Sequence, residues 1–151
     1  MKLKKIFENI DFVNRYQSIC EKYNDFDNRM RDSTKQIQKE VLDSFNYKYK
    51  YVSNGSFYQI KEENNEISFS LHMVIKGGVI ETLFFLDVDG KTIEPQGRID
   101  FFPEDLGIPF ERLKCGALPK YGSEEELKEI LKEIFSIYED LKKEFVKQLE
   151  N

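Results

Sequence analysis

The chain has a single histidine, His72, and histidine is the side chain that most often moves protons or binds metal ions near neutral pH. A usual zinc site needs several His or Cys ligands, but Cys20 and Cys115 lie far apart and neither stands in a CxxC or Cys/His motif. A catalytic triad would need a nucleophile and an acid around His72, and no local motif indicates either. We therefore predict that the protein binds no metal and no cofactor, and we interpret His72 as a residue on the less apolar face of a strand.

Two short patterns resemble ion-binding or phosphate-binding loops but lack the decisive residues. The run from Asp87 to Gly90 has the spacing of the middle of a calcium loop. Phe85, however, stands where the first ligand belongs, and Gln96 stands where a bidentate glutamate belongs. Gly77 and Gly78 lack the glycine spacing and the lysine of a phosphate loop. We predict that both patterns are turns between strands.

Paired carboxylates are another source of acid–base chemistry, and the chain has several, including Glu62/Glu63 and Glu104/Asp105. We see at neither pair the apolar setting that would raise the pKa of one carboxyl group for acid catalysis. We therefore nominate no catalytic residue.

Tyr47, Tyr49 and Tyr51 alternate with Lys48 and Lys50, a combination that can stack on single-stranded nucleic acid and neutralise its charge. Alternate residues of a strand point to opposite faces, so the tyrosines and the lysines would be separated. We predict a strand with one of these faces in the core and the other in solvent.

The charge distribution indicates the kind of partner. Lys and Arg number 23 against 28 Asp and Glu, a net charge of −5, which argues against nucleic acid as the main partner. The acids concentrate in the middle of the chain, where they would attract a basic protein if they share one face. The alternative is a solvated rim of scattered acids. The acids that we predict to form a partner-binding patch are Asp87, Asp89, Glu94, Asp100, Glu104, Asp105 and Glu111.

The segment from Pro95 to Tyr121 is unusual in composition. It holds all four prolines and, together with Gly122, four of the eight glycines. A long connection without regular structure is usually functional or disordered, and this one is too hydrophobic for disorder. We predict an ordered segment whose acids, from Asp100 to Glu111, face solvent. The residues predicted to pack it are Phe101, Phe102, Leu106, Ile108, Phe110 and Leu113.

Apolar spacing predicts the elements that position these residues. The predicted helices cover 6–23 and 26–45, and the predicted strands cover 47–51, 57–61, 67–75, 79–88 and 98–102. Ser123 and Glu126 form a capping box at the start of a long amphipathic C-terminal helix. The order predicts an α+β fold in which helices pack on one face of an antiparallel meander sheet of four to five strands.

The 151 residues are expected to form a single domain, 1–151. The basic start lacks the apolar run of a signal peptide, and no stretch approaches the ~18 apolar residues of a membrane span. We expect a cytoplasmic protein with reduced cysteines and no membrane partner.

The succession of a sheet, the loop RIDFFPEDLGIPF and the helix SEEELKEILKEIF in a small acidic chain resembles the immunity proteins of bacterial polymorphic-toxin and contact-dependent growth inhibition systems. The resemblance covers most of the chain and includes no signature motif. It implies a non-catalytic protein that neutralises one cognate toxin domain, often a basic nuclease, by blocking its active site or an essential surface. Immunity interfaces differ from pair to pair, so the resemblance assigns no residue a role.

Two other classes stay open. A small enzyme would assemble its site from scattered residues around the 95–122 loop, namely Arg98, Asp100, Glu104 and Tyr121. A phage or mobile-element accessory protein would act by binding another protein. The sequence does not indicate whether the chain forms a homo-oligomer.

Overall fold

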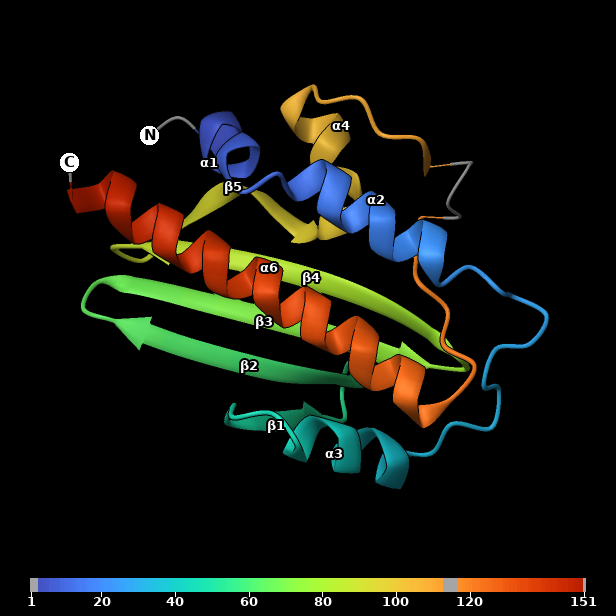
Figure 1. Ribbon diagram of the computed structural model, residues 1–151. Coiled ribbons are helices and arrows are strands. Elements are labelled where there is room, and N and C mark those ends of the chain that lie inside the picture. The colour runs from blue at the N-terminus through green and yellow to red at the C-terminus, as the bar shows by residue number, and fades with distance from the viewer. Residues whose placement is uncertain (1–2, 113–116, 151) are drawn as a thin grey trace.

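The computed structural model describes residues 3–112 and 117–150 and shows an α+β fold, as predicted. A five-stranded antiparallel sheet carries helices on one face, and the longest of them, α6, lies over the sheet roughly along its strands (Figure 1). The helices are α1 (Leu3–Asn9), α2 (Phe12–Lys22), α3 (Lys35–Asp43), α4 (Phe102–Leu106) and α6 (Glu124–Glu150), with a 3-10 turn η1 (Ile99–Phe101). The strands are β1 (Tyr49–Val52), β2 (Phe57–Asn64), β3 (Ile67–Lys76), β4 (Val79–Val88) and β5 (Lys91–Arg98).

The sheet is a simple meander in which each strand pairs with the next one along the chain. Tight turns containing Gly55, Gly77–Gly78 and Gly90 connect the strands, so the glycine patterns at 77–78 and 87–90 are turns as predicted. In the register of β3 and β4, His72 pairs with Leu83 and Ser70 pairs with Phe85. Strand alternation places these four side chains on the face opposite the helices.

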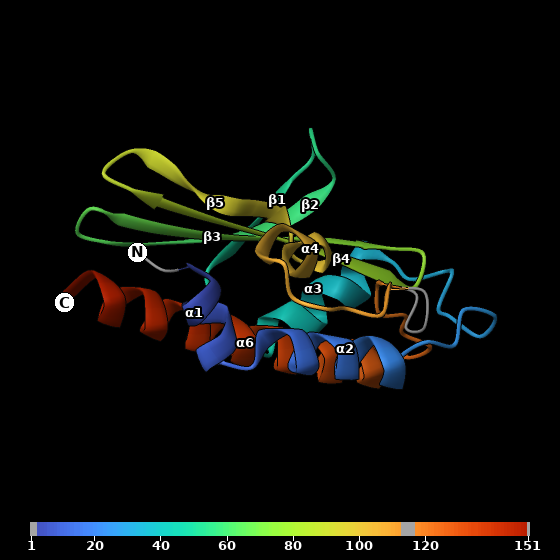
Figure 2. The same ribbon diagram turned by 90° about the horizontal axis from the view of Figure 1, so that it is seen from above.

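The core lies between the sheet and α6. Buried side chains alternate along β3 and β4, and α6 meets them with one apolar stripe, as its sequence predicts. Aromatic rings fill the middle of this interface: Phe84 stacks on Phe145 with 6.1 Å between centroids and meets Tyr138 edge-on at 6.2 Å. Seen from above, the helical layer lies under one face of the sheet, and no described helix crosses the other face (Figure 2). That second face is called the open face below.

The N-terminal helices are shorter than predicted. The single helix expected over 6–23 is broken at Asp11, which has a left-handed backbone (φ 56°) and separates α1 from α2. The helix expected over 26–45 begins only at α3, where the Thr34 side chain caps the helix by accepting a hydrogen bond from the Ile37 amide (3.2 Å). The preceding residues form a loop, and Phe26 in this loop is 54% exposed.

The last strand also differs from prediction. Strand β5 covers Lys91–Arg98, whereas the sequence predicts a strand over 98–102. After Arg98 the chain turns into η1 and then α4, which has Pro103 in its first turn and ends at Gly107 with a left-handed backbone (φ 69°). Part of the predicted irregular segment is therefore helical, and α4 packs against β5.

The two edges of the sheet are poorly suited to pairing with another strand. Edge strand β1 has only four residues, and its flanking Lys48 and its own Lys50 are exposed. Edge strand β5 contains Pro95, which has no N–H to donate, and its pairing with β4 shifts register between Phe84 and Leu86.

Residues 119–121 complete the sheet beside the first residues of β4. The Ile80 amide donates to the Pro119 carbonyl (3.1 Å), and the Tyr121 amide donates to the Gly78 carbonyl (2.9 Å). The loop that contains Arg29 lies against this corner, and a Cβ added at Gly78 would come within 2.7 Å of the Arg29 Cβ. The expected packing role of Leu113 lies outside the described residues.

No helix within 3–112 and 117–150 combines the length and the apolarity that crossing a membrane requires.

Candidate partner-binding surface

Asp100 is buried, contrary to the prediction that it faces solvent and contacts a partner. Its residue exposure is 1%. Arg98 donates from Nε to Oδ1 (3.0 Å) and from Nη2 to Oδ2 (2.9 Å), while Arg112 donates from Nη1 to Oδ2 (2.9 Å) and to the Asp100 carbonyl (2.8 Å). A buried carboxylate needs such charged partners, and two guanidinium groups supply them. Asp100 therefore orders the segment from within.

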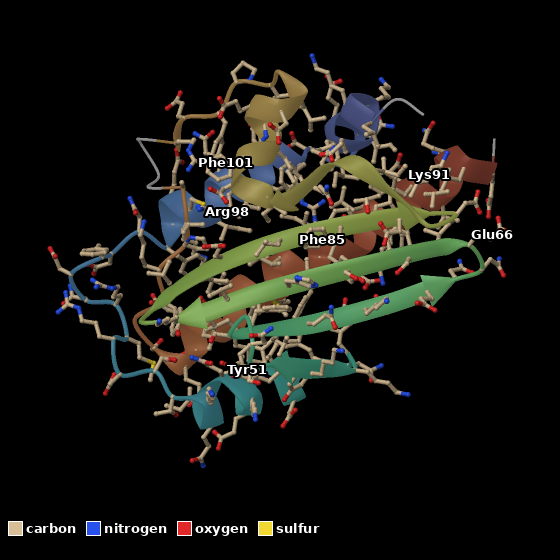
Figure 3. The ribbon with its side chains drawn as sticks, turned by 180° about the vertical axis from the view of Figure 1, so that it is seen from behind. Tyr51, Glu66, Phe85, Lys91, Arg98 and Phe101 are labelled. Atoms are coloured by element: carbon tan, nitrogen blue, oxygen red, sulfur yellow. The ribbon has the colours of Figure 1, made fainter. Side chains whose placement is uncertain are left out.

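The two guanidinium groups also hold an exposed aromatic ring. The Cζ atoms of Arg98 and Arg112 lie 4.6 Å and 4.4 Å from the centroid of the Phe101 ring, within cation–π range. Phe101 is 38% exposed, contrary to the prediction that it packs the segment. Figure 3 shows Phe101 and Arg98 side by side near the end of β5. This group of Arg98, Asp100, Phe101 and Arg112 is called the arginine clamp below.

Asp100 also affects the titration of Arg98. Partial burial alone would lower the pKa of the Arg98 guanidinium, but its hydrogen bonds to Asp100 and the charge of that carboxylate outweigh burial and raise the pKa. Asp100 therefore favours the charged form of Arg98.

The short helix α4 presents one apolar and one acidic side. Phe102 and Pro103 are buried, and the Phe102 ring is fully covered. Glu104 and Asp105 are exposed and form no ion pair with another described residue. They follow Phe101 by three and four positions, a spacing that places all three side chains on one side of a helical turn. The outward surface of this turn thus combines a ring with two carboxylates.

The other predicted acids lie along β5 and beside it. Asp89 is exposed in the turn before β5, Glu94 is exposed on β5, and Glu111 is exposed after α4. Asp87 on β4 is only partly exposed, and its Oδ1 atom is shielded without a hydrogen-bond partner among the described residues. Three of these four acids are therefore accessible, as predicted.

Glu66 adds a further acidic residue at the start of β5. The turn between β2 and β3 brings Glu66 beside Asp89, whose amide donates to the Glu66 carbonyl (3.0 Å). A hydrogen bond and the charge of the Asp89 carboxylate raise the pKa of the Glu66 carboxyl group. In Figure 3 Glu66 marks this end of the sheet, close to Lys91.

The segment that forms β5, α4 and their flanking turns is negative overall. Residues 87–112 contain seven acids and three bases, a net charge of −4. Two of the three bases, Arg98 and Arg112, are engaged with the buried Asp100. The surface formed by Asp89, Glu94, Glu104, Asp105 and Phe101 is called the acidic edge below.

The residues nominated for an enzyme site do not converge on one point. Arg98 and Asp100 form an ion pair, and Glu104 points to solvent from α4. Tyr121 is fully buried at the start of β4, where its hydroxyl donates to the Ser33 hydroxyl (2.8 Å). Arg98 and Asp100 neutralise one another's charge.

The single histidine lies in an aromatic row on the open face. The His72 ring stacks on Phe57 (4.4 Å between centroids) and meets Phe85 at 4.9 Å, and Gln59 hydrogen bonds to its Nε2 atom (3.0 Å). Burial lowers the pKa of His72 below its usual value. The alternation of β3 places His72 on the open face, as the interpretation of this residue predicts.

A partly buried polar network joins α6 to β2 on the helix-covered face of the sheet. Lys142 donates to Glu62 (2.6 Å) and pairs with Glu139 (2.9 Å), while the hydroxyl groups of Tyr138 and Tyr47 donate to the same two carboxylates. Burial and these carboxylates raise the pKa of both tyrosines. The network borders a cavity of about 470 Å³, but the amine is already neutralised, so the arrangement cross-links two elements.

Comparison of the chain with models of protein families, with curated proteins and with solved structures found no match. The surface itself thus carries the functional argument. Within the described parts of the chain, no three His, Cys, Asp or Glu residues are arranged to hold a metal ion.

Sequence reasoning missed the clamp because Arg112 joins Arg98 and Asp100 from 12 residues beyond Asp100. Arg112 is separated from Asp100 by α4 and the turn after it, and the sequence gives no sign that both arginines converge on one carboxylate. A usable signal was the odd composition of RIDFF, in which an acid stands between apolar residues two positions after an arginine.

Proposed function

We propose that this protein binds and neutralises a cognate basic toxin domain through the acidic edge. The observation that carries the proposal is the unbalanced charge of the edge. Glu104 and Asp105 are exposed and form no ion pair with any residue of 3–112 and 117–150, and the neighbouring Arg98 and Arg112 are paired with Asp100. A basic domain would be attracted to this surface and oriented by it. The resemblance to immunity proteins supplies the partner class.

The proposal places the partner on side chains, because both sheet edges disfavour strand addition. Pro95 and the register shift interrupt β5, and β1 is short and lysine-flanked. A partner would therefore meet α4 and the outward side chains of β5. Blocking an active site in this way requires no turnover by the inhibitor.

The test uses the purified basic C-terminal domain of the toxin encoded beside this protein's gene. The double variant Glu104→Gln/Asp105→Asn removes two negative charges while leaving Asp100 in place. Its association rate at low salt is expected to fall by about fivefold, and the difference should shrink as salt screens the charges. The matched control, Asp27→Asn/Asp32→Asn, removes the same charge from exposed positions of the loop between α2 and α3 and should leave the rate unchanged.

Four results would overturn the proposal. An equal loss of rate in both double variants would show that net charge matters and the acidic edge does not. A toxin domain that does not bind, or a gene without a neighbouring toxin, would remove the partner class. Turnover of a small substrate by the purified protein would favour an enzyme instead.

A further inference from the structure

We propose that Phe101 is the anchor residue of the acidic edge, a ring held in place so that it can insert into an apolar pocket on the basic partner. This inference rests on the proposed function and names the residue that holds the complex together once the charges have guided association. Buried aromatic and arginine residues supply most of the binding energy of typical interfaces, whereas peripheral charges mainly set the rate of association.

Phe101 stays exposed although the adjacent phenylalanine is buried. Phe101 and Phe102 are adjacent, and the fold buries Phe102 completely while leaving Phe101 38% exposed. The Phe102 ring meets the Phe7 ring edge-on (5.6 Å between centroids), so Phe102 supplies the apolar contact that α4 needs with the core. Folding therefore does not require the second ring.

The Phe101 ring is also held rigidly. The guanidinium group of Arg98 lies 4.6 Å from the centroid of this ring, and that of Arg112 lies 4.4 Å from it. Both guanidinium groups are fixed in turn by the fully covered carboxylate of Asp100. A side chain that is immobilised before binding loses little conformational entropy when the complex forms, which lowers the cost of using it as an anchor.

The exposed residues beside Phe101 on this turn are acidic. Glu104 and Asp105 lie on the same side of the turn as Phe101, and neither has a partner among the described residues. The surface that fits is therefore an apolar pocket the size of one ring, bordered by lysine or arginine side chains. The proposed basic toxin domain supplies such a border.

Phe26 provides a matched comparison within the same chain. Its ring is 54% exposed and lies 3.7 Å from the Arg29 guanidinium. Arg29, however, donates to the carbonyl groups of Phe26 and Gly77 and not to a buried carboxylate. Phe26 is thus an exposed, arginine-stacked phenylalanine outside the acidic edge.

The experiment measures binding of the same toxin domain to Phe101→Ala and Phe26→Ala by surface plasmon resonance, with thermal unfolding of both variants as a check on folding. Phe101→Ala is expected to weaken the dissociation constant by about 30-fold, mainly through faster dissociation. Phe26→Ala should stay within about threefold of the unchanged protein. Phe101→Leu keeps an apolar cover over the guanidinium groups, so it should keep its melting temperature and still weaken binding by about fivefold.

The outcomes separate the anchor from the proposed function. If the unchanged protein binds and Phe101→Ala or Phe101→Leu binds equally well, the anchor is wrong while the proposed function stands. If Phe26→Ala shows the large loss instead, the partner sits on the loop between α2 and α3, and both the anchor and the acidic edge are wrong. If the unchanged protein does not bind the toxin domain, the proposed function fails and the anchor fails with it.

Discussion

Replacing Asp100 by asparagine tests whether this buried carboxylate organises the segment after β5. The substitution keeps the size of the side chain and removes its charge, so two guanidinium groups lose their counter-ion. Asp100 accepts three side-chain hydrogen bonds from Arg98 and Arg112, and an asparagine amide can accept only part of them.

The size of the effect follows from burial. Removing one partner of a buried ion pair costs about 3–5 kcal/mol. Arg98 and Arg112 have side chains that are 32% and 31% exposed, so water partly compensates them. We therefore expect the low end, a loss of about 3 kcal/mol in the free energy of unfolding. Unfolding entropy for 151 residues converts this loss into a melting temperature lower by about 9 °C.

The measurement is urea unfolding followed by circular dichroism, together with a thermal scan. Asp105→Asn is the matched control, because it makes the same chemical change at an exposed position five residues away and should alter stability by less than about 0.5 kcal/mol. A loss below about 1 kcal/mol for Asp100→Asn would show that the ion pairs are not what holds η1 and α4 in place.

Three further predictions concern the packing and the histidine. Gly78→Ala should lower the free energy of unfolding by more than about 2 kcal/mol, since its Cβ would collide with Arg29 and its backbone is left-handed (φ 82°). Gly77→Ala has open space around it and should lower this free energy by about 1 kcal/mol. Equal urea midpoints for the two variants would contradict this. Phe102→Ala should lower the free energy of unfolding by about 3 kcal/mol, because the ring is fully buried. A loss below about 0.5 kcal/mol would mean that the ring does not contribute to the core as its burial indicates. Burial lowers the pKa of His72 in the folded protein. Between that lowered value and the unfolded value of about 6.5 the unfolded chain binds more protons, so stability should fall as the pH drops through this window. The fall should be absent in His72→Gln, and an identical pH profile of stability for the two proteins would refute the assignment.

The architecture was predictable where local patterns repeat. Alternation along residues 67–88 and the stripe of the C-terminal helix each give many consistent positions, so β3, β4 and α6 appear nearly as predicted. The break at Asp11 was not predictable, because the apolar spacing continues through it and a left-handed residue leaves no pattern. Element ends of this kind depend on a single backbone conformation.

The candidate surface was predictable only in part. Glu104 and Asp105 are exposed as their charge suggests, but Asp100 has the same chemistry and the opposite environment. Likewise Phe101 and Phe102 are equivalent in sequence, and only their position around the turn decides which ring enters the core. These assignments depend on Arg112, whose approach to Asp100 is a long-range contact that local patterns do not encode.

Both edges of the sheet are poorly suited to pairing with another strand, and this affects how recognition can change during evolution. Strand addition takes much of its affinity from hydrogen bonds to the peptide backbone, which every sequence shares, so that part of such an interface does not discriminate between related partners. Here Pro95 and the register shift interrupt one edge, and the other has only four residues. Contact must then be made through side chains, each of which can be exchanged without altering the sheet. Such a chain can follow a diverging partner one substitution at a time, and each step can also exclude the partners of its relatives.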